Sequence, residues 1–357
     1  MRVMITIQHP GHVHFFRHAI HELESRNHEV FVFARENEMT DDLLTHYGIE
    51  YEMLAGATDS LVSLAAVQAT YELKILRRAR DLDPDVIAAI GGVAAAHVST
   101  VVDARSVVFY DTEHARLITG LAYPFADLIC TPACYRDNLG PKQLCYPGYH
   151  ELAYLHPDRF TPDPAVRSAI GIEPTDPLVV CRFSSWDSSH DVGQGGFENV
   201  ADVVAALDAT GAHIIVSSEI DLPPGLDVYT MPVAPHRMHD LLATADVVVS
   251  EGATTAAEAA VLGTPAVYVN SLCMGYTDEL DDRYGLLFSC NDADRHRKGI
   301  QLATSLLDSS IDDLWTRRLA RLRSETVDVT DIIVTSIETT GRPFRPRTER
   351  LEQRPGY

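Results

Sequence analysis

The chain has 357 residues, which suggests about two domains and is long enough to bury one or two sizeable cores. Asp and Glu number 51 against 29 Lys and Arg, giving a net charge of −22, and only three of the basic residues are lysines. So acidic a composition with so little lysine resembles the surface of proteins from halophilic cells, where molar salt screens self-repulsion. It excludes broad electrostatic binding to nucleic acid.

The sequence carries no sign of a membrane span or a leader peptide. It contains no run of 18 or more apolar residues, which predicts that no helix crosses a membrane. The apolar stretch 1–7 is too short for a signal peptide and is interpreted as a buried strand. Six cysteines without a Cys-x-x-Cys pair favour reduced structural cysteines over a zinc or disulfide framework, so we expect a cytoplasmic protein.

The first half alternates short apolar runs with segments of helical period. Strands alternating with helices predict βαβ units and a parallel sheet. Between 132 and 165 the pattern gives way to Pro, Gly, Tyr and His, which predicts an interdomain connection. The predicted strands are 2–7, 29–34, 50–54, 85–90, 105–110 and 127–131, and the predicted helices are 12–26, 38–47, 59–81, 93–103 and 113–122.

The second half repeats this pattern without repeating the residues. We therefore predict an α/β fold of two Rossmann-like, doubly wound domains facing across a cleft, at 1–150 and 151–340, followed by a basic tail at 341–357. Ligands of such sheets bind at the carboxyl ends of the strands. The predicted strands are 177–183, 212–217, 227–230, 246–249, 265–269 and 286–289, and the predicted helices are 196–210, 236–244, 253–262, 292–307, 311–325 and 329–339.

The loop after the first strand is one candidate site. Gly11 permits a tight turn into a helix, whose N-terminal N–H groups suit an anionic or hydroxyl-rich ligand. His12 and His14 fall at the helix start, where burial and the dipole favour a neutral imidazole able to take a proton. The alternative is that these histidines are structural.

A second candidate site lies between the buried strand 246–249 and a helix of small residues. The backbone N–H groups of Gly252, Ala253, Thr254 and Thr255 are suited to hold a diphosphate, with two threonine hydroxyls beside them. Glu258, one helical turn further on, has the length to accept two hydrogen bonds from a ribose diol. The alternative is a capped helix start with an exposed glutamate.

The loop at 182–196 is a third candidate. The planar fork of Arg182 suits phosphate oxygens, Trp186 suits stacking on a base or sugar, and His190 supplies a hydrogen bond. The alternative is a solvated Ser/Gly loop.

A fourth candidate follows the fifth strand. Asp111, Glu113 and His114 place two carboxylates and an imidazole within four residues, and Glu113 is a candidate acid or base. The alternatives are that Asp111 caps the helix and that Glu113 is a first-turn helix glutamate. Gly91 and Gly92 end the fourth strand, so their loop is expected to open into the same cleft.

Metal binding is weakly supported, and we expect neither a metal nor a cofactor. The acidic run 278–282 is interpreted as a solvated face, because consecutive residues on a helix diverge. No Asp-x-Asp follows a strand as a divalent-metal site for a nucleotide sugar would need. Phe15, Phe16 and the basic tail suggest peripheral contact with the inner face of the cell membrane, whereas a frayed terminus is the alternative for the tail.

The stretch 245–265 resembles the donor-binding segment of GT-B glycosyltransferases, and most closely the peptidoglycan-type N-acetylglucosaminyltransferases. In that family the small residues bind diphosphate, and the glutamate that matches Glu258 binds the ribose of a UDP-sugar. Gly11-His12-Val13 resembles the same enzymes' Gly-His-x loop, whose histidine is a candidate base. Glu251 stands where Gly or Ser is usual, and its charge is expected to repel phosphate unless it points away.

Over roughly residues 1–290 the chain resembles an archaeal GT-B-like family known as domain of unknown function 354. The resemblance implies the fold more strongly than the reaction. The segments that carry it are His12-Val13-His14-Phe15-Phe16, Asp111-Thr112-Glu113-His114-Ala115, Gly148-Tyr149-His150-Glu151-Leu152-Ala153-Tyr154-Leu155, Arg182-Phe183, Trp186 and His190-Asp191.

Three functions stay open. One is an inverting, metal-independent glycosyltransferase that moves a sugar from a nucleotide-diphosphate sugar, most simply a UDP-sugar, to a saccharide or lipid-linked acceptor, with His12 or Glu113 as base. Another is an epimerase resembling the non-hydrolysing UDP-N-acetylglucosamine 2-epimerases, whose catalytic glutamate falls in the segment 110–115, although their His-Arg-Arg-Glu-Asn motif is replaced by Arg182-Phe183-Ser184-Ser185. The third is a non-catalytic subunit that binds a sugar nucleotide and needs a partner.

Overall fold

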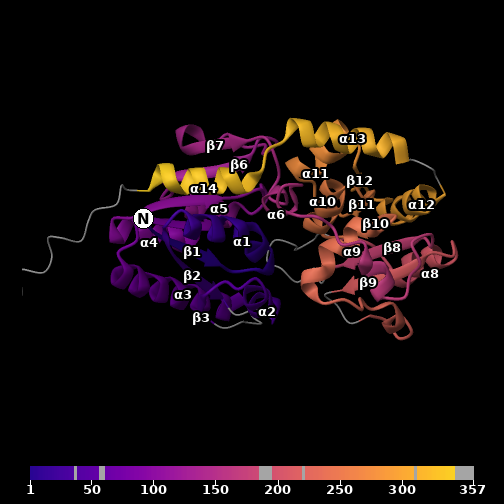
Figure 1. Cartoon of the computed structure of the whole chain (residues 1–357), viewed down its shortest axis with the longest axis horizontal. Coiled ribbons are helices and arrows are strands. Elements are labelled where there is room, and N and C mark those ends of the chain that lie inside the picture. Colours follow the sequence, from indigo (N-terminus) through magenta and orange to yellow (C-terminus); the bar gives the residue numbers. More distant parts are fainter. Residues whose placement is uncertain (36–37, 56–60, 185–194, 219–221, 309–311, 342–357) are drawn as a thin grey trace, which may run out of the picture.

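The computed structural model describes residues 1–35, 38–55, 61–184, 195–218, 222–308 and 312–341, and within them the chain forms two parallel β-sheets at opposite ends of the long axis (Figure 1). The first sheet has the strand order β3-β2-β1-β4-β5-β6-β7, with parallel pairing throughout. Its strands are β1 (Arg2–Ile7), β2 (Glu29–Arg35), β3 (Tyr51–Ala55), β4 (Val86–Ile90), β5 (Arg105–Phe109), β6 (Leu128–Pro132) and β7 (Gln143–Tyr146).

Six of these strands confirm the sequence prediction to within one or two residues. The strand β7 was missed because it is short, lies at the sheet edge and buries only Tyr146 fully, so it shows no apolar run. Helix α1 begins at Pro10, two residues earlier than predicted, because the His9 ring accepts the Gly11 N–H (3.1 Å) and caps the helix. The helices of this half are α1 (Pro10–Ser25), α2 (Glu38–His46), α3 (Leu61–Leu82), α4 (Val93–Val102) and α5 (Arg116–Ala122).

The second sheet has the order β12-β11-β10-β8-β9. Five of the six strands predicted for this half are confirmed, but the strand predicted at 227–230 is wrong. Asp227–Tyr229 is a 3₁₀ turn whose chain touches β9 through one isolated bridge, Val216 to Thr230, because the apolar run is too short to extend a ladder. The strands are β8 (Leu178–Phe183), β9 (His213–Ser218), β10 (Val247–Ser250), β11 (Ala266–Val269) and β12 (Leu287–Cys290).

Helices surround the second sheet much as the pattern predicted. Helix α8 is shorter than the predicted 196–210, since the Asn199 side chain caps it by accepting the Ala201 N–H (3.0 Å). A short helix, α11, and a π-helical turn at Leu280–Tyr284 were not predicted. The helices of this half are α8 (Val200–Asp208), α9 (Met238–Thr244), α10 (Ala253–Leu262), α11 (Gly275–Glu279), α12 (Arg295–Leu307), α13 (Asp312–Glu325) and α14 (Val329–Thr340).

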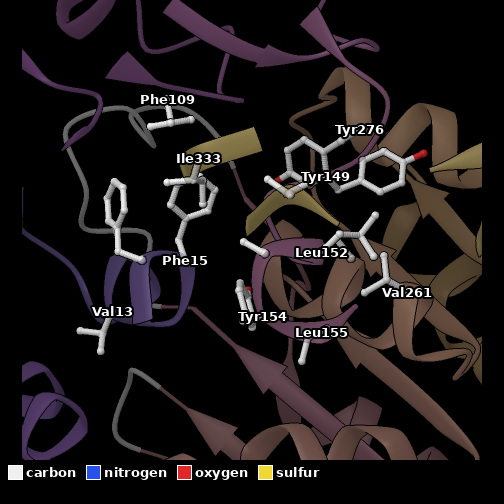
Figure 2. Packing of buried hydrophobic residues seen from close by; sticks show 14 of the residues in the cluster. Val13, Phe15, Phe109, Tyr149, Leu152, Tyr154, Leu155, Val261, Tyr276 and Ile333 are labelled. Atoms are coloured by element: carbon white, nitrogen blue, oxygen red, sulfur yellow. The ribbon is translucent and has the colours of Figure 1, made fainter. Parts of the chain in front are cut away.

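The predicted connection at 132–165 is not an open linker. It holds β7, the short helix α6 (Leu152–Leu155) and the 3₁₀ turn Gly140–Lys142, and α7 (Ala165–Ala169) follows it. All four residues of α6 are buried, and they belong to one apolar cluster that runs from β1 and α1 into α10 and α11. Figure 2 shows this cluster, with Leu152 and Leu155 of α6 near Val261 of α10. Both halves therefore share one core through α6.

Helix α14 returns to the first half of the chain. It packs against α1 and β5, and Figure 1 shows it beside the first sheet although it ends the range predicted for the C-terminal domain. Its apolar stripe, Ile333, Val334 and Ile337, is fully buried there. An apolar stripe predicts that a helix packs, but it does not predict on which sheet.

Candidate functional site

The candidate residues gather where each sheet reverses its strand order. In the first sheet β1 and β4 are neighbours that are not consecutive in the chain, and in the second sheet β8 and β10 are. Doubly wound sheets bind ligands at this point, outside the carboxyl ends of the strands. Of the predicted residues, Trp186 and His190 lie outside the described part of the chain.

The His12 ring lies directly beyond β1. Its Nδ1 accepts the backbone N–H of Gln8 (3.3 Å), so the neutral ring carries its proton on Nε2. Burial lowers the pKa of His12 well below its usual value, and His9 and His150 lower it further. The second ring nitrogen of His12 is thus a hydrogen-bond donor and not an acceptor.

Half-buried Asp111 and buried His150 form a pair that was not predicted. Asp111 Oδ2 lies 3.1 Å from His150 Nδ1, and the Thr112 hydroxyl donates to Asp111 Oδ1 (2.9 Å). The His150 side chain is buried, and its Nε2 contacts no hydrogen-bond partner among the described residues. Asp111 therefore orients an imidazole instead of capping a helix. The only signal in the sequence was the Gly148–Leu155 segment of the family resemblance.

Glu113 lies in the turn before α5 and not in its first helical turn, because α5 begins at Arg116. Its Oε1 accepts the N–H groups of Gly275 (3.1 Å) and Arg136 (3.3 Å), and its buried Oε2 has no partner among the described residues. Burial raises the pKa of Glu113, and the backbone donors oppose the shift. Since Gly275 begins α11, Glu113 joins the two halves of the molecule.

Further unpartnered polar atoms lie close by. Glu151 is buried, its Oε2 has no partner in the described chain, and burial, with help from Asp111, raises its pKa well above the usual range. The Tyr146 hydroxyl is likewise buried without a described partner. Buried polar atoms are nearly always hydrogen-bonded, so a group of exceptions marks a place where water or a ligand completes the bonding. We call these residues the buried polar cluster: Asp111, Glu113, Tyr146, His150 and Glu151.

The turn after β4 explains why two other predicted acceptor-binding residues are glycines. Gly91 and Gly92 have φ values of +70° and +64°, and a Cβ on Gly92 would lie 2.6 Å from Val108 of β5. The turn therefore requires glycine for conformation and for close packing. His114 lies in the turn that also holds Glu113, half-buried before α5.

On the second sheet, Glu251 points away from the diphosphate loop. Its carboxylate accepts the backbone N–H of Ser184 (2.9 Å) and of Phe197 (2.7 Å), and it is 2% exposed. The Asn270 amide holds the Glu251 carbonyl (2.9 Å). The charge of Glu251 is thus bonded to the backbone N–H groups of Ser184 and Phe197, which counters the expectation that it repels an anion at the start of α10.

The start of α10 offers free backbone donors. The first intrahelical bond runs from the Ala256 N–H to the Gly252 carbonyl (3.2 Å), which leaves the N–H groups of Ala253, Thr254 and Thr255 unused by the helix. The Gly252 N–H is bonded to the Ser250 hydroxyl (3.1 Å), so it is not available to a ligand in this arrangement. Within the described part of the chain, three of the four predicted donors are thus open to an anion.

Glu258 is buried at the junction of the two halves and is not an exposed helix residue. Its Oε1 accepts the Tyr154 hydroxyl (2.8 Å) and contacts His239 Nε2 (3.0 Å). Both contacts use Oε1, so Oε2 carries no described contact. The His239 ring in turn packs edge-on against His14 of α1, with the ring centroids 4.7 Å apart.

Arg17 extends this junction from the first half. Its guanidinium is buried, donates to the Tyr154 carbonyl (3.3 Å) and lies 4.5 Å from the centre of the Tyr47 ring. Next to it is a cavity of about 350 Å³ between α1, α2 and α9. The cavity is lined by Arg17, His18, His21, Tyr47, Phe160, His236 and His239. Arg182, by contrast, lies at the end of β8 and donates to the Ser217 hydroxyl of β9 (2.8 Å).

The acidic run 278–282 is not the solvated face that its charge predicted. Asp278 pairs with Arg136, and Glu279 accepts the Tyr149 hydroxyl (2.8 Å), so both bind residues of the first half. Asp281 accepts the Ser289 N–H (2.8 Å). The carboxylates are used for contacts between the halves and within the second half.

The aromatic pair proposed for membrane contact is buried. Phe15 and Phe16 are at most 1% exposed, and Figure 2 shows Phe15 beside Phe109 and Ile333 in the core. The interpretation of these rings as a lipid contact is therefore wrong, since they follow the core-facing stripe of α1. The described helices include none with the length and apolarity to span a membrane.

Burial of neutral His14 makes stability depend on pH. Burial lowers the pKa of His14 well below its usual value, and His239 and Arg17 lower it further, so the folded chain gains a proton there less readily than the unfolded chain. The unfolded state is therefore favoured as pH falls below about 6.5. Acidic groups with a raised pKa, Glu113 and Glu151, act in the opposite direction.

The variant His14→Gln isolates the contribution of His14 to the pH dependence of stability, because Glu113 and Glu151 are present in both the variant and the wild type. Between pH 7.5 and 5.5 the Tm of His14→Gln is expected to fall less than that of the wild type, by roughly 2–3 °C. Exposed His213→Gln is the matched control and keeps the wild-type slope. Parallel curves for wild type and His14→Gln would contradict a neutral buried His14.

These features define the class of the protein: two Rossmann-like halves with their ligand edges facing each other, which is the GT-B fold. Comparison with known proteins supports this class. Residues 1–160 match the model of a family described as "Protein of unknown function (DUF354)", which confirms the resemblance found in the sequence. The described residues include no group of three or more His, Cys, Asp or Glu placed to hold a metal ion.

A curated relative and solved structures agree with this fold. The chain is 30% identical over 206 residues, 55% of its length and 54% of the relative's, to the UDP-N-acetylglucosamine–N-acetylmuramyl-(pentapeptide) pyrophosphoryl-undecaprenol N-acetylglucosamine transferase of Clavibacter sepedonicus. The chain thus spans about half the length of that relative. Among solved structures, the spinosyn rhamnosyltransferase SpnG is 14% identical (TM-score 0.64), covering 95% of this chain and 100% of that chain. UDP-GlcNAc 2-epimerase from Neisseria meningitidis, solved with UDP-GlcNAc, is 13% identical (TM-score 0.66), covering 95% and 100%.

Proposed function

We propose that the chain transfers a sugar from a UDP-sugar to a saccharide or lipid-linked acceptor, with inversion and without a metal. The observation that carries this proposal is the junction at Glu258. There Glu258, one turn beyond the first N–H groups of α10, bonds to Tyr154 of α6 and to His239. The His239 ring packs against His14 of the first half. The curated relative named as an N-acetylglucosaminyltransferase supports transfer as the reaction.

In this proposal the second half binds the donor. The N–H groups of residues 253–255 and the helix dipole hold the diphosphate, and Glu258 Oε2 accepts the ribose hydroxyls. Arg182, Trp186 and His190 belong to the same donor side. The positive N-terminal end of α10 stabilises the negative charge that develops on the leaving diphosphate. In other transferases a metal ion performs this task.

The first half binds the acceptor. The groups that bind the acceptor hydroxyls are supplied by one edge of the first sheet, at His12, His14, Gly91, Gly92 and the 111–114 turn. Of these residues, His12 and Glu113 are the ones predicted to take or give a proton. Contacts such as Glu113 to the Gly275 N–H hold the cleft closed over the reacting atoms. Peripheral membrane contact now depends on the tail beyond residue 341 alone, since Phe15 and Phe16 are buried.

A nucleotide panel tests the proposal. In molar potassium chloride, 1 mM UDP is expected to raise the Tm by several degrees, whereas GDP, dTDP and CMP raise it less. UDP-GlcNAc is then incubated alone and its products are analysed. Slow release of UDP supports transfer to water in place of the acceptor. If no nucleotide shifts the Tm, the donor site is wrong.

Epimerisation is a second candidate function, because Glu113 combines a raised pKa with an unpartnered oxygen beside the cleft. The fold does not separate the two activities, since a 2-epimerase shares it. In the same incubation, conversion of UDP-GlcNAc to its C2 epimer would favour this function, as it needs no acceptor.

A further inference from the structure

Asp111 and His150 have the arrangement of an oriented base. Asp111 Oδ2 lies 3.1 Å from His150 Nδ1, and a carboxylate accepts hydrogen bonds but does not donate them. The neutral imidazole therefore carries its proton on Nδ1, and Nε2 keeps a lone pair. The bond from the Thr112 hydroxyl to Asp111 Oδ1 (2.9 Å) holds the carboxylate in place.

The Nε2 atom has no structural use. It is buried without a hydrogen-bond partner among the described residues, and leaving a buried polar atom unpaired costs about 1–3 kcal/mol. The ring packs 4.5 Å, centre to centre, from Phe15, and Figure 2 shows Phe15 beside Phe109. These apolar rings offer Nε2 no hydrogen bond, so the hydroxyl group of a ligand, or a water molecule in its place, can complete its bonding.

We infer that His150, oriented by Asp111, is the general base that takes the proton from the attacking hydroxyl of the acceptor. The inference deepens the proposed function and rests on it. The acceptor oxygen forms a bond to the anomeric carbon as the bond from that carbon to the diphosphate oxygen breaks. The hydroxyl proton moves to His150 Nε2, the diphosphate leaves with the electron pair, and Asp111 balances the imidazolium charge until solvent removes the proton.

The two bases predicted from the sequence are less suited to this step. His12 accepts the Gln8 N–H at Nδ1 and offers an N–H at Nε2, so it suits holding an oxygen more than taking a proton. Glu113 holds the closing contact to Gly275. Among the described residues, the titratable groups that interact with His150 include Asp111 and His12. Burial lowers the pKa of His150 below its usual value, and Asp111 opposes part of this shift, so the ring is held neutral.

The experiment measures UDP release from UDP-GlcNAc across pH 5–9 in wild type, His150→Gln, Asp111→Asn and the control His156→Gln. His156 follows α6 and pairs with Asp158 (3.6 Å), so its substitution removes a histidine of the same segment outside the cluster. We expect release by His150→Gln to fall at least about 100-fold while its Kd for UDP changes less than about threefold. Asp111→Asn should move the acid limb of the profile to lower pH, because loss of the carboxylate lowers the imidazole pKa.

Failure of this inference is distinguishable from failure of the proposed function. If His150→Gln releases UDP at the wild-type rate, or if the acid limb of the pH profile does not move in Asp111→Asn, His150 is not the base. The proposed function is unaffected by either result. No UDP binding and no release by the wild type overturn both. If His150→Gln does not fold, ¹⁵N spectra of the wild-type ring decide the point, since an Nε2-protonated tautomer of His150 contradicts the inference and an Nδ1-protonated tautomer supports it.

Discussion

Replacing Glu258 by glutamine is expected to weaken UDP binding about 30-fold while leaving the fold intact. A hydrogen bond to a charged group contributes roughly 2 kcal/mol more than its neutral replacement when the site is buried, and Glu258 is 7% exposed. The amide oxygen of glutamine can still accept the Tyr154 hydroxyl and the His239 N–H, which now bond to Oε1. Titration calorimetry with UDP in molar potassium chloride measures the difference.

The matched control is Glu338→Gln, which removes the same charge from α14, where Glu338 pairs with Arg26 (2.9 Å) and His28 (3.0 Å). Its Kd for UDP should equal that of the wild type. Tyr154→Phe removes the hydroxyl that shares Oε1 and should change the Kd by less than about threefold. Equal UDP affinity in Glu258→Gln and wild type would show that Glu258 only ties α10 to α6 and α9.

Most of the fold could be predicted because the signals are local. Buried parallel strands are continuous apolar runs, and amphipathic helices repeat their apolar residues at 3.6 positions, so eleven of the twelve described strands and most long helices follow from short windows of sequence. The edge strand β7 and the turn at 227–229 depend on neighbours that a window does not contain. The position of α14 depends on which apolar surface the second half leaves uncovered.

The candidate site was predicted in part for the same reason. A loop of small residues before a helix indicates an anion site wherever it occurs, and Glu258 follows it by one turn. Asp111 and His150 meet only because β5 ends beside the connection to α6, and no spacing in the sequence encodes that contact. The bonds from Glu251 to the N–H groups of Ser184 and Phe197 likewise depend on how the chain folds, so the sequence could not predict the direction in which this carboxylate points.

Replacing Gly275 by alanine is expected to keep the halves from closing and to reduce UDP release from UDP-GlcNAc about 10- to 100-fold. A Cβ at this position would overlap the carbonyl oxygen of Cys134 and lie 2.6 Å from Glu113 Oε1, so the first half must move away from α11. The φ angle of Gly275 is not positive, and alanine is the better helix former, so the backbone of α11 tolerates the change. The loss then arises from the contact between the halves, which closure requires.

The measurement pairs UDP release with small-angle scattering. Gly275→Ala should show a larger radius of gyration than the wild type and a Kd for UDP within about threefold, because the proposed donor-binding residues lie within the second half. Gly120→Ala in α5 is the matched control, since no atom lies within 4 Å of its added Cβ, and it should match the wild type in both measurements. Wild-type release together with an expanded Gly275→Ala would mean that neither the Glu113–Gly275 contact nor closure of the halves is needed for the reaction.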